Sequence, residues 1–153
     1  MREQAGKEGT TEAKEYLLQI RQISGAIDRR KKELKNLRSS GMSLRPQNYL
    51  VDRVQHSYSG QRSEKMAEWR ADLQREIQED IERLAKLRYE IVTTINGLSR
   101  PEYSEMLHSI YVEGKDLART AEEMHYSYNY ACTLHGRALK EFWRKHLKER
   151  KES

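Results

Sequence analysis

The chain has 153 residues, of which 36% are hydrophobic and 35% are charged, with a formal net charge of +5. This composition excludes one thick globular core and favours long helices that each bury a narrow apolar stripe. No apolar run reaches the roughly 18 residues that a membrane-spanning helix needs, and the polar N-terminus does not resemble a signal peptide. A single cysteine cannot form an internal disulfide, which favours a reducing cytoplasm. We therefore expect a cytoplasmic, all-α protein of one or two small domains.

The first two thirds of the chain are expected to form a long helical hairpin. Residues 1–10 are expected to be disordered, and the hairpin is expected over residues 11–98, with a loop at about 39–62. Its first helix carries a coiled-coil-like seam of about three heptads. The seam consists of Ile20, Ile23, Ile27, Leu34 and Leu37. It can pair with the second helix of the same chain or with another copy, and the excess of apolar length predicts a homodimer.

Residues 29–38 are strongly basic, since six of them are Lys or Arg and one is acidic. Three interpretations are open: pairing with the acidic stretch of the second helix, contact with a DNA backbone, or binding of an acidic protein. Pairing within the chain is favoured because it requires no further partner. The acidic stretch itself is typical of a solvated helix face rather than of a carboxylate site. Its carboxylates are Glu76, Glu79, Asp80 and Glu82.

Residues 99–146 have the pattern of a small three-helix domain. A scaffold helix from about 102 to 112 is expected to end at Gly114, because glycine tolerates the left-handed conformation of a helix C-terminus. A short helix over 116–124 follows, and Ser127 stands where an N-cap belongs. The buried residues of the last two helices are expected to be Leu117, Ala121, Met124, Ala131, Leu134 and Ala138. This is the helix-turn-helix pattern, whose second helix enters the DNA major groove.

The same segments carry a family resemblance. The DNA-binding fourth region of sigma factors resembles this chain at Tyr111–Lys115 (YVEGK), Ala121–Met124 (AEEM), Ser127 and Arg137–Lys140 (RALK). The wider chain is similar to ArpU/RinA-type regulators encoded by phages and prophages of Gram-positive bacteria, at residues 13–21 and 134–142. This resemblance implies a transcription regulator in a bacterial cytoplasm, acting on late packaging and lysis genes. The chain departs from the sigma-factor pattern at Thr120, where Ile is usual, and at Ala131, where Val is usual.

Charge is distributed unevenly over this C-terminal region. Residues 101–130 hold 2 Lys/Arg against 6 Asp/Glu, whereas residues 131–153 hold 7 against 3. The expected second helix and the basic tail at 147–153 therefore offer cations to DNA phosphates, and the scaffold before them is acidic. The alternative is a solvated run of charge at the end of a helix.

The helix face opposite the expected buried side gives the candidate DNA-binding residues. They are Ser127, Tyr128, Asn129, Tyr130, Cys132, Thr133, Gly136, Arg137, Lys140 and Arg144. Asn129 suits the N6/N7 edge of adenine, Thr133 suits a thymine methyl, and Arg137 suits guanine or phosphate. Gly136 permits a close approach to the duplex or is a tolerated helix defect.

Nothing in the sequence indicates catalysis, a metal or a cofactor. There is no HxxxH pair, no second cysteine, no Gly-rich phosphate loop and no GxSxG turn. We expect a non-enzymatic protein that binds double-stranded DNA as a homodimer, with host RNA polymerase as an open further partner. Two alternatives stay open: a coiled-coil adaptor or inhibitor of a host factor, and a phage DNA-packaging subunit.

Overall fold

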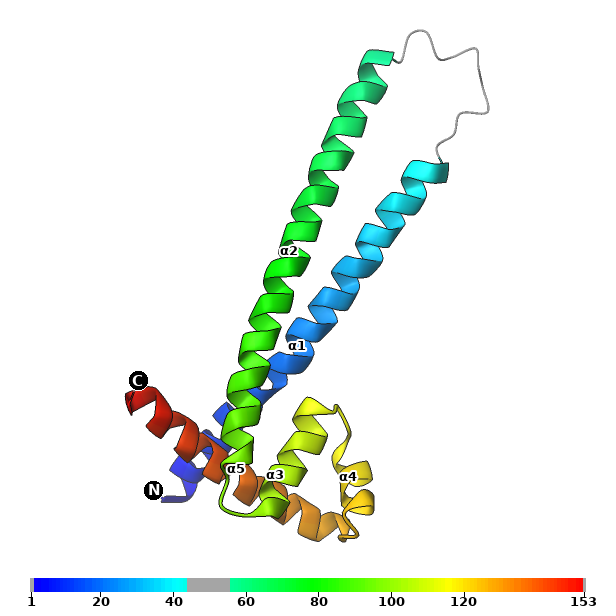
Figure 1. Ribbon diagram of the computed structural model, residues 1–153. Helices are drawn as coiled ribbons and strands as arrows, with labels where there is room; N and C mark the ends of the chain where they lie inside the picture. Colours follow the sequence, from blue (N-terminus) through cyan, green and yellow to red (C-terminus); the bar gives the residue numbers. More distant parts are fainter. Residues whose placement is uncertain (1, 44–55, 153) are drawn as a thin grey trace. The chain divides into compact units, whose positions relative to one another are not determined.

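The structure is a computed structural model that describes residues 2–43 and 56–152 (Figure 1). Within these residues it is all-α, without a strand, as the sequence predicts. The elements are α1 (Arg2–Ser43), α2 (His56–Asn96), α3 (Pro101–Leu107), a π-helix η1 (His108–Val112), α4 (Leu117–Glu123) and α5 (Tyr128–Glu152). In this described part of the chain, no helix has the length and apolar character that crossing a membrane requires.

The chain divides into two compact units. Unit 1 comprises Met1–Ile23 and Leu84–Ser153, and unit 2 comprises Ser24–Arg83. The sequence predicted a different division, with a hairpin over 11–98 and a separate domain over 99–146. The first part of α1 and the last part of α2 instead share a unit with the C-terminal helices. The reason is a common hydrophobic core, to which each of these segments contributes.

The core of unit 1 joins α1, α2, η1 and α5. Leu17 of α1, Ile91 of α2 and Phe142 of α5 are each 0% exposed. The other buried members are Ala13, Ile20, Ile95, Leu98, Leu107, Tyr111, Ala138 and Leu139. Burying such side chains is the main favourable contribution to folding, and here the contributors come from both ends of the chain.

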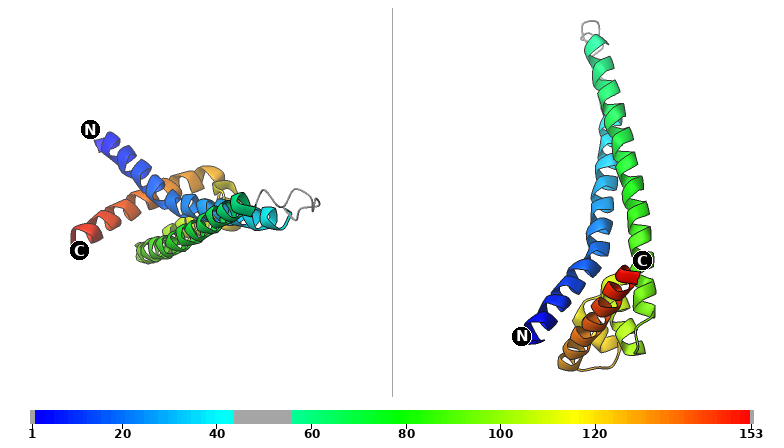
Figure 2. Two further views of the ribbon diagram at one scale, coloured as in Figure 1. Left: turned by 90° about the horizontal axis from the view of Figure 1, so that it is seen from above. Right: turned by 90° about the vertical axis from the view of Figure 1, so that its left-hand side faces the viewer.

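The expectation that residues 1–10 are disordered is wrong for residues 2–10, which are helical. Small residues at helical spacing explain the difference. A Cβ added to Gly6 would lie 3.5 Å from Lys140 Cε, and one added to Gly9 would lie 3.3 Å from Trp143 Cδ1. Ala13, on the same side, is 0% exposed. The start of α1 thus crosses α5 (Figure 2), and the close approach at Gly6 and Gly9 orders a segment whose composition favours disorder.

The expected loop at 39–62 is shorter than predicted. Helix α1 continues to Ser43 and α2 begins at His56, so residues 39–43 and 56–62 are helical. A helix that is already nucleated gains one hydrogen bond for each residue it adds, and neither stretch contains a proline to stop it. Residues 44–55 lie outside the described part of the chain.

Unit 2 is held together by a small apolar cluster and an ion-pair network. Leu37 of α1 packs with Leu73 and Ile77 of α2. The Arg30 guanidinium pairs with the buried Asp80 carboxylate, and its Nε lies 3.3 Å from Glu76. For Arg30, the favoured interpretation of the basic run is therefore confirmed, since it pairs with the acidic stretch of the second helix.

The seam proposed for homodimerisation is largely buried within one chain. Ile20 is 5% exposed in the core of unit 1, and Leu37 is 8% exposed in the cluster of unit 2. Ile27 is also 5% exposed, while Ile23 and Leu34 are half-buried. Pairing within the chain thus occupies the apolar side that a partner would need. Homodimerisation stays a prediction, and it needs a surface other than this seam.

The contact between α1 and α5 gives a stability prediction. Gly9→Leu places a branched side chain where Trp143 already lies, so we expect a loss of about 1–3 kcal/mol in the free energy of unfolding. Gly60→Leu is the matched control, because nothing lies within 4 Å of a Cβ added there. The control is expected to be neutral or slightly stabilising, since glycine is a poor helix former. Chemical denaturation followed by circular dichroism measures both. Equal effects of the two substitutions would contradict the close α1–α5 contact.

Candidate nucleic-acid interface

Helix α5 is fixed by two hydrophobic clusters along one side. Near its start, Ala131 and Leu134 pack with Met106 of α3 and Ala121 of α4. Farther along, Ala138 and Phe142 enter the core of unit 1. The buried side predicted from Ala131, Leu134 and Ala138 is confirmed, since their exposed fractions are 0%, 1% and 0%. The opposite side of the first three turns is therefore directed away from both clusters.

Helix α4 begins and ends with satisfied backbone groups. The Asp116 side chain caps its N-terminus by accepting a hydrogen bond from the Arg119 N–H at 2.7 Å. The buried Thr120, at the position where sigma-like domains usually carry Ile, donates its hydroxyl hydrogen to the Asp116 carbonyl at 2.9 Å. A buried hydroxyl that is hydrogen-bonded in this way costs little, so Thr120 is compatible with an intact helix.

The turn between α4 and α5 is a Schellman motif. The Tyr126 N–H donates to the Ala121 carbonyl at 2.9 Å, and the His125 N–H donates to the Glu122 carbonyl at 3.1 Å. His125 has a φ of 60°, the left-handed conformation that the motif requires. Ser127 then caps α5, because its hydroxyl accepts from the Tyr130 N–H at 3.2 Å. The predicted N-cap is confirmed, and the chain reverses over four residues.

The scaffold before α4 is not the single α-helix that the sequence predicts. It is α3 followed by η1, in which the Glu113 N–H donates to the His108 carbonyl, five residues earlier, at 3.0 Å. Such a π-turn holds one more residue than an α-turn and so changes the direction of the side chains after it. It ends where predicted, at Gly114, whose φ is 77°. The apolar periodicity gave no signal of this extra residue.

The buried Tyr111 of η1 and the half-buried His135 of α5 form a polar pair. The Tyr111 hydroxyl and His135 Nε2 are 2.8 Å apart, and the two rings stack at a centroid distance of 5.8 Å. Burial raises the pKa of Tyr111 to about 12. Burial, with a smaller effect of the Lys14 charge, lowers the pKa of His135 to about 4. The imidazole is therefore neutral at pH 7 and ties α5 to the scaffold.

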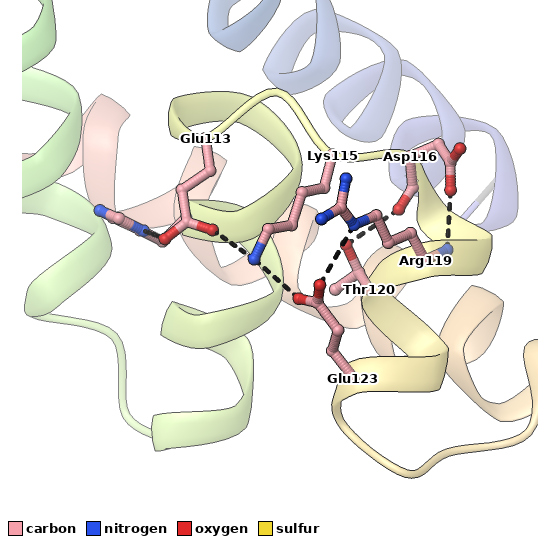
Figure 3. Close-up of polar contacts among 7 residues, drawn as sticks. Glu113, Lys115, Asp116, Arg119, Thr120 and Glu123 are labelled. Carbon is pink, nitrogen blue, oxygen red and sulfur yellow. Dashed lines mark hydrogen bonds and ion pairs between the residues drawn. The ribbon is translucent and has the colours of Figure 1, made fainter.

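An exposed ion-pair network covers the η1–α4 side of this unit (Figure 3). Lys115 Nζ lies 2.8 Å from Glu113 and 2.7 Å from Glu123, and Arg119 Nε lies 3.2 Å from the other oxygen of Glu123. The ammonium of Lys115 lowers the pKa of both carboxyl groups, and they in turn raise the pKa of Lys115. The cations on this side are thus engaged by carboxylates of the same chain.

The candidate residues at the start of α5 are on its accessible side. Asn129, Thr133 and Arg137 are exposed and follow one another at four-residue spacing, so they line one face. The Thr133 hydroxyl donates to the Asn129 carbonyl at 3.2 Å, which leaves its methyl group and acceptor lone pairs for a ligand. Cys132 and Ser127 are exposed beside them.

The tyrosines around the turn lie in two different environments. Tyr126 packs against the Met106/Ala121/Ala131/Leu134 cluster, and Tyr130 meets its ring edge-on at a centroid distance of 5.0 Å. Tyr128 and Tyr130 are 57% and 43% exposed. Their hydroxyls can therefore meet a phosphate, a common role of tyrosine at DNA backbones.

Three other candidates lie farther along α5. Nothing lies within 4 Å of a Cβ added to Gly136, so within the chain the space over this half-buried residue is open. Lys140 is exposed, and the end of its side chain lies beside Gly6 of α1. Arg144 is exposed one turn beyond. The exposed side of α5 thus continues from residue 127 to Arg144, and α1 borders it at Lys140.

The basic tail expected at 147–153 continues α5 as far as Glu152. Lys145, just before it, has a structural role, because its Nζ donates to the Gly97 carbonyl at 2.5 Å. Glu141 accepts from the Ser99 N–H at 3.0 Å. Together these two hydrogen bonds hold residues 97–99, which connect α2 and α3, against α5. Sequence reasoning missed both, since only the folded chain brings these residues next to residues 97–99.

The chain was compared with protein-family models, with curated proteins and with solved structures, and no match was found in any of the three comparisons.

The lowered pKa of the half-buried His135 imidazole predicts a pH dependence of stability. Because its pKa is lowered in the folded state from the usual 6.5, its contribution is complete above about pH 6.5 and is lost as the pH falls toward 4. Between pH 7 and 5 we expect a loss of up to about 2 kcal/mol. His135→Gln, which keeps a hydrogen-bonding group for Tyr111, should make the dependence shallower. Burial also lowers the pKa of His146, so a residual slope of the same sign remains. Identical pH profiles for the two proteins would contradict this account.

Proposed function

We propose that this protein is a sequence-specific, double-stranded-DNA-binding transcription regulator, and that α4, the turn and α5 act as a helix-turn-helix. In this proposal the first turns of α5 enter the major groove and α3, η1 and α4 hold it there. The observation that carries the proposal is the face of Asn129, Thr133 and Arg137: polar, exposed and directed away from both clusters. The phage or prophage origin and the activation of late genes rest on the family resemblance alone.

The chemistry of this face suits the edges of bases. The Asn129 amide can donate and accept at once, which matches adenine N6 and N7, and the Arg137 guanidinium matches guanine O6 and N7 or a phosphate. The Thr133 methyl can contact a thymine methyl. The open space over Gly136 would let the helix approach the duplex closely. Tyr128 and Tyr130 would contact the backbone at the edge of the groove.

The distribution of ion pairs supports the same orientation. On the η1–α4 side, Lys115 and Arg119 are engaged by Glu113 and Glu123. On α5, neither Arg137 nor Arg144 takes part in a salt bridge within the described residues. Cations without a carboxylate partner can release counterions from phosphates without first breaking an ion pair. The basic helix would therefore face DNA and the acidic scaffold would face away.

Two substitutions test which residues read DNA. Asn129→Ala and Arg137→Ala should each weaken binding to the preferred site by roughly 5- to 150-fold, the equivalent of about 1–3 kcal/mol for one base contact. Matched controls are Asn96→Ala and Arg119→Ala, which change exposed residues of the same types in the same unit. Fluorescence anisotropy at several salt concentrations gives affinity and salt slope. The face assignment is wrong if neither α5 variant differs from its control.

The wider function is tested by the DNA that the protein selects. A mobility-shift titration against promoter and packaging regions of the encoding genome is expected to give shifts at a promoter. Shifts only at a packaging site would indicate a DNA-packaging subunit. No shift at any DNA would indicate an interaction protein, and would refute the proposal. The unmodified full chain serves in all three cases, and light scattering of the same samples tests the predicted homodimer.

A further inference from the structure

Helix α1 carries a stripe of exposed cations for which the described residues show no salt bridge. Lys31, Lys35 and Arg38 are exposed and lie at spacings of four and three residues, so they follow one another on one flank of the helix. Lys32 lies beside them. At 100° per residue, Glu33, the one carboxylate of residues 29–38, lies on the other side of the helix. We call Lys31, Lys35 and Arg38 the basic stripe.

The basic stripe differs from its neighbour Arg30. Arg30 points to α2, where it pairs with Asp80 and Glu76. Within the described residues, no salt bridge involves a residue of the basic stripe. The favoured interpretation of the basic run therefore explains Arg30 but not the basic stripe, for which the described residues provide no salt-bridge partner.

Keeping like charges together has a cost. Cations at three- and four-residue spacing on a helix destabilise it by roughly 0.2–0.5 kcal/mol for each pair, because neighbouring charges repel. The seam side chains Ile27 and Leu37, which fix the rotation of α1, hold the stripe outward. An external polyanion would remove the repulsion and turn it into an attraction.

We propose that the basic stripe is a second DNA contact, which binds the phosphate backbone without reading sequence. This inference rests on the proposed function, and it adds a contact in unit 2, whereas the α5 face belongs to unit 1. Seven residues separate the ends of the stripe, a rise of about 10 Å along the helix. Successive phosphates of one strand advance by about 3.4 Å along the duplex, so the stripe spans about three phosphate steps and its three cations can each meet a phosphate of that strand.

The test neutralises the stripe and compares it with an equal loss of charge elsewhere. The stripe variant carries Lys31→Gln, Lys35→Gln and Arg38→Gln, and the control carries Arg62→Gln, Lys65→Gln and Lys86→Gln, which are exposed residues of α2. The probe is a random-sequence DNA duplex, and the readout is the slope of log affinity against log salt. Three lost phosphate contacts should reduce this slope by about 2–3, since each phosphate contributes about 0.9. The control should leave it nearly unchanged, and thermal denaturation verifies that both variants fold.

Each outcome has one meaning. A reduced slope for the stripe variant alone supports the inference, even if Asn129→Ala and Arg137→Ala prove silent and the α5 proposal fails. Equal slopes for the stripe variant and the control overturn the inference and leave the α5 proposal standing. Unchanged DNA binding together with lost binding to polyglutamate also overturns it, and assigns the stripe to an acidic protein. An unmodified protein that binds no duplex overturns both proposals.

Discussion

The burial of one side of α5 is the constraint on which unit 1 depends. This helix supplies Ala131 and Leu134 to one cluster and Ala138, Leu139 and Phe142 to another, so both clusters fix its rotation. A helix with one side held in this way must present its other side to solvent or to a ligand. The exposed face of Asn129, Thr133 and Arg137 is thus a geometric consequence of the core. The position of that face is therefore set by the buried side chains of α5, on the opposite side of the helix.

Polar side chains make this arrangement specific. The Tyr111–His135 hydrogen bond joins α5 to the scaffold, and Lys145 and Glu141 join it to the connection after α2. Apolar contacts alone are non-directional and tolerate small rotations of a helix. Hydrogen bonds to defined atoms do not, because geometry away from the optimum weakens them steeply. The close approach of Gly9 to Trp143 holds α1 against α5 as well.

Local signals predicted the local structure of the candidate site. Ser127 as an N-cap, Gly114 as a left-handed helix end and the buried side of α5 are all confirmed, because each depends on neighbours within a few residues. The order of residues 2–10 could not be predicted from composition, since it depends on a contact with α5 more than a hundred residues away in sequence. The π-turn of η1 and the position of the Lys140 side chain likewise depend on tertiary packing. The seam of α1 was recognised correctly as apolar, but the sequence did not show that one chain buries most of it.

The central claim is that the exposed face of α5 meets DNA. The most direct measurement is an amide-resolved nuclear magnetic resonance titration of the full chain with a DNA duplex carrying its selected site. The account predicts that the largest shifts fall on residues 128–137 of α5, while the Glu113–Lys115–Glu123 network shifts little. Shifts concentrated on that network, or an unperturbed α5 in the presence of bound DNA, would contradict it.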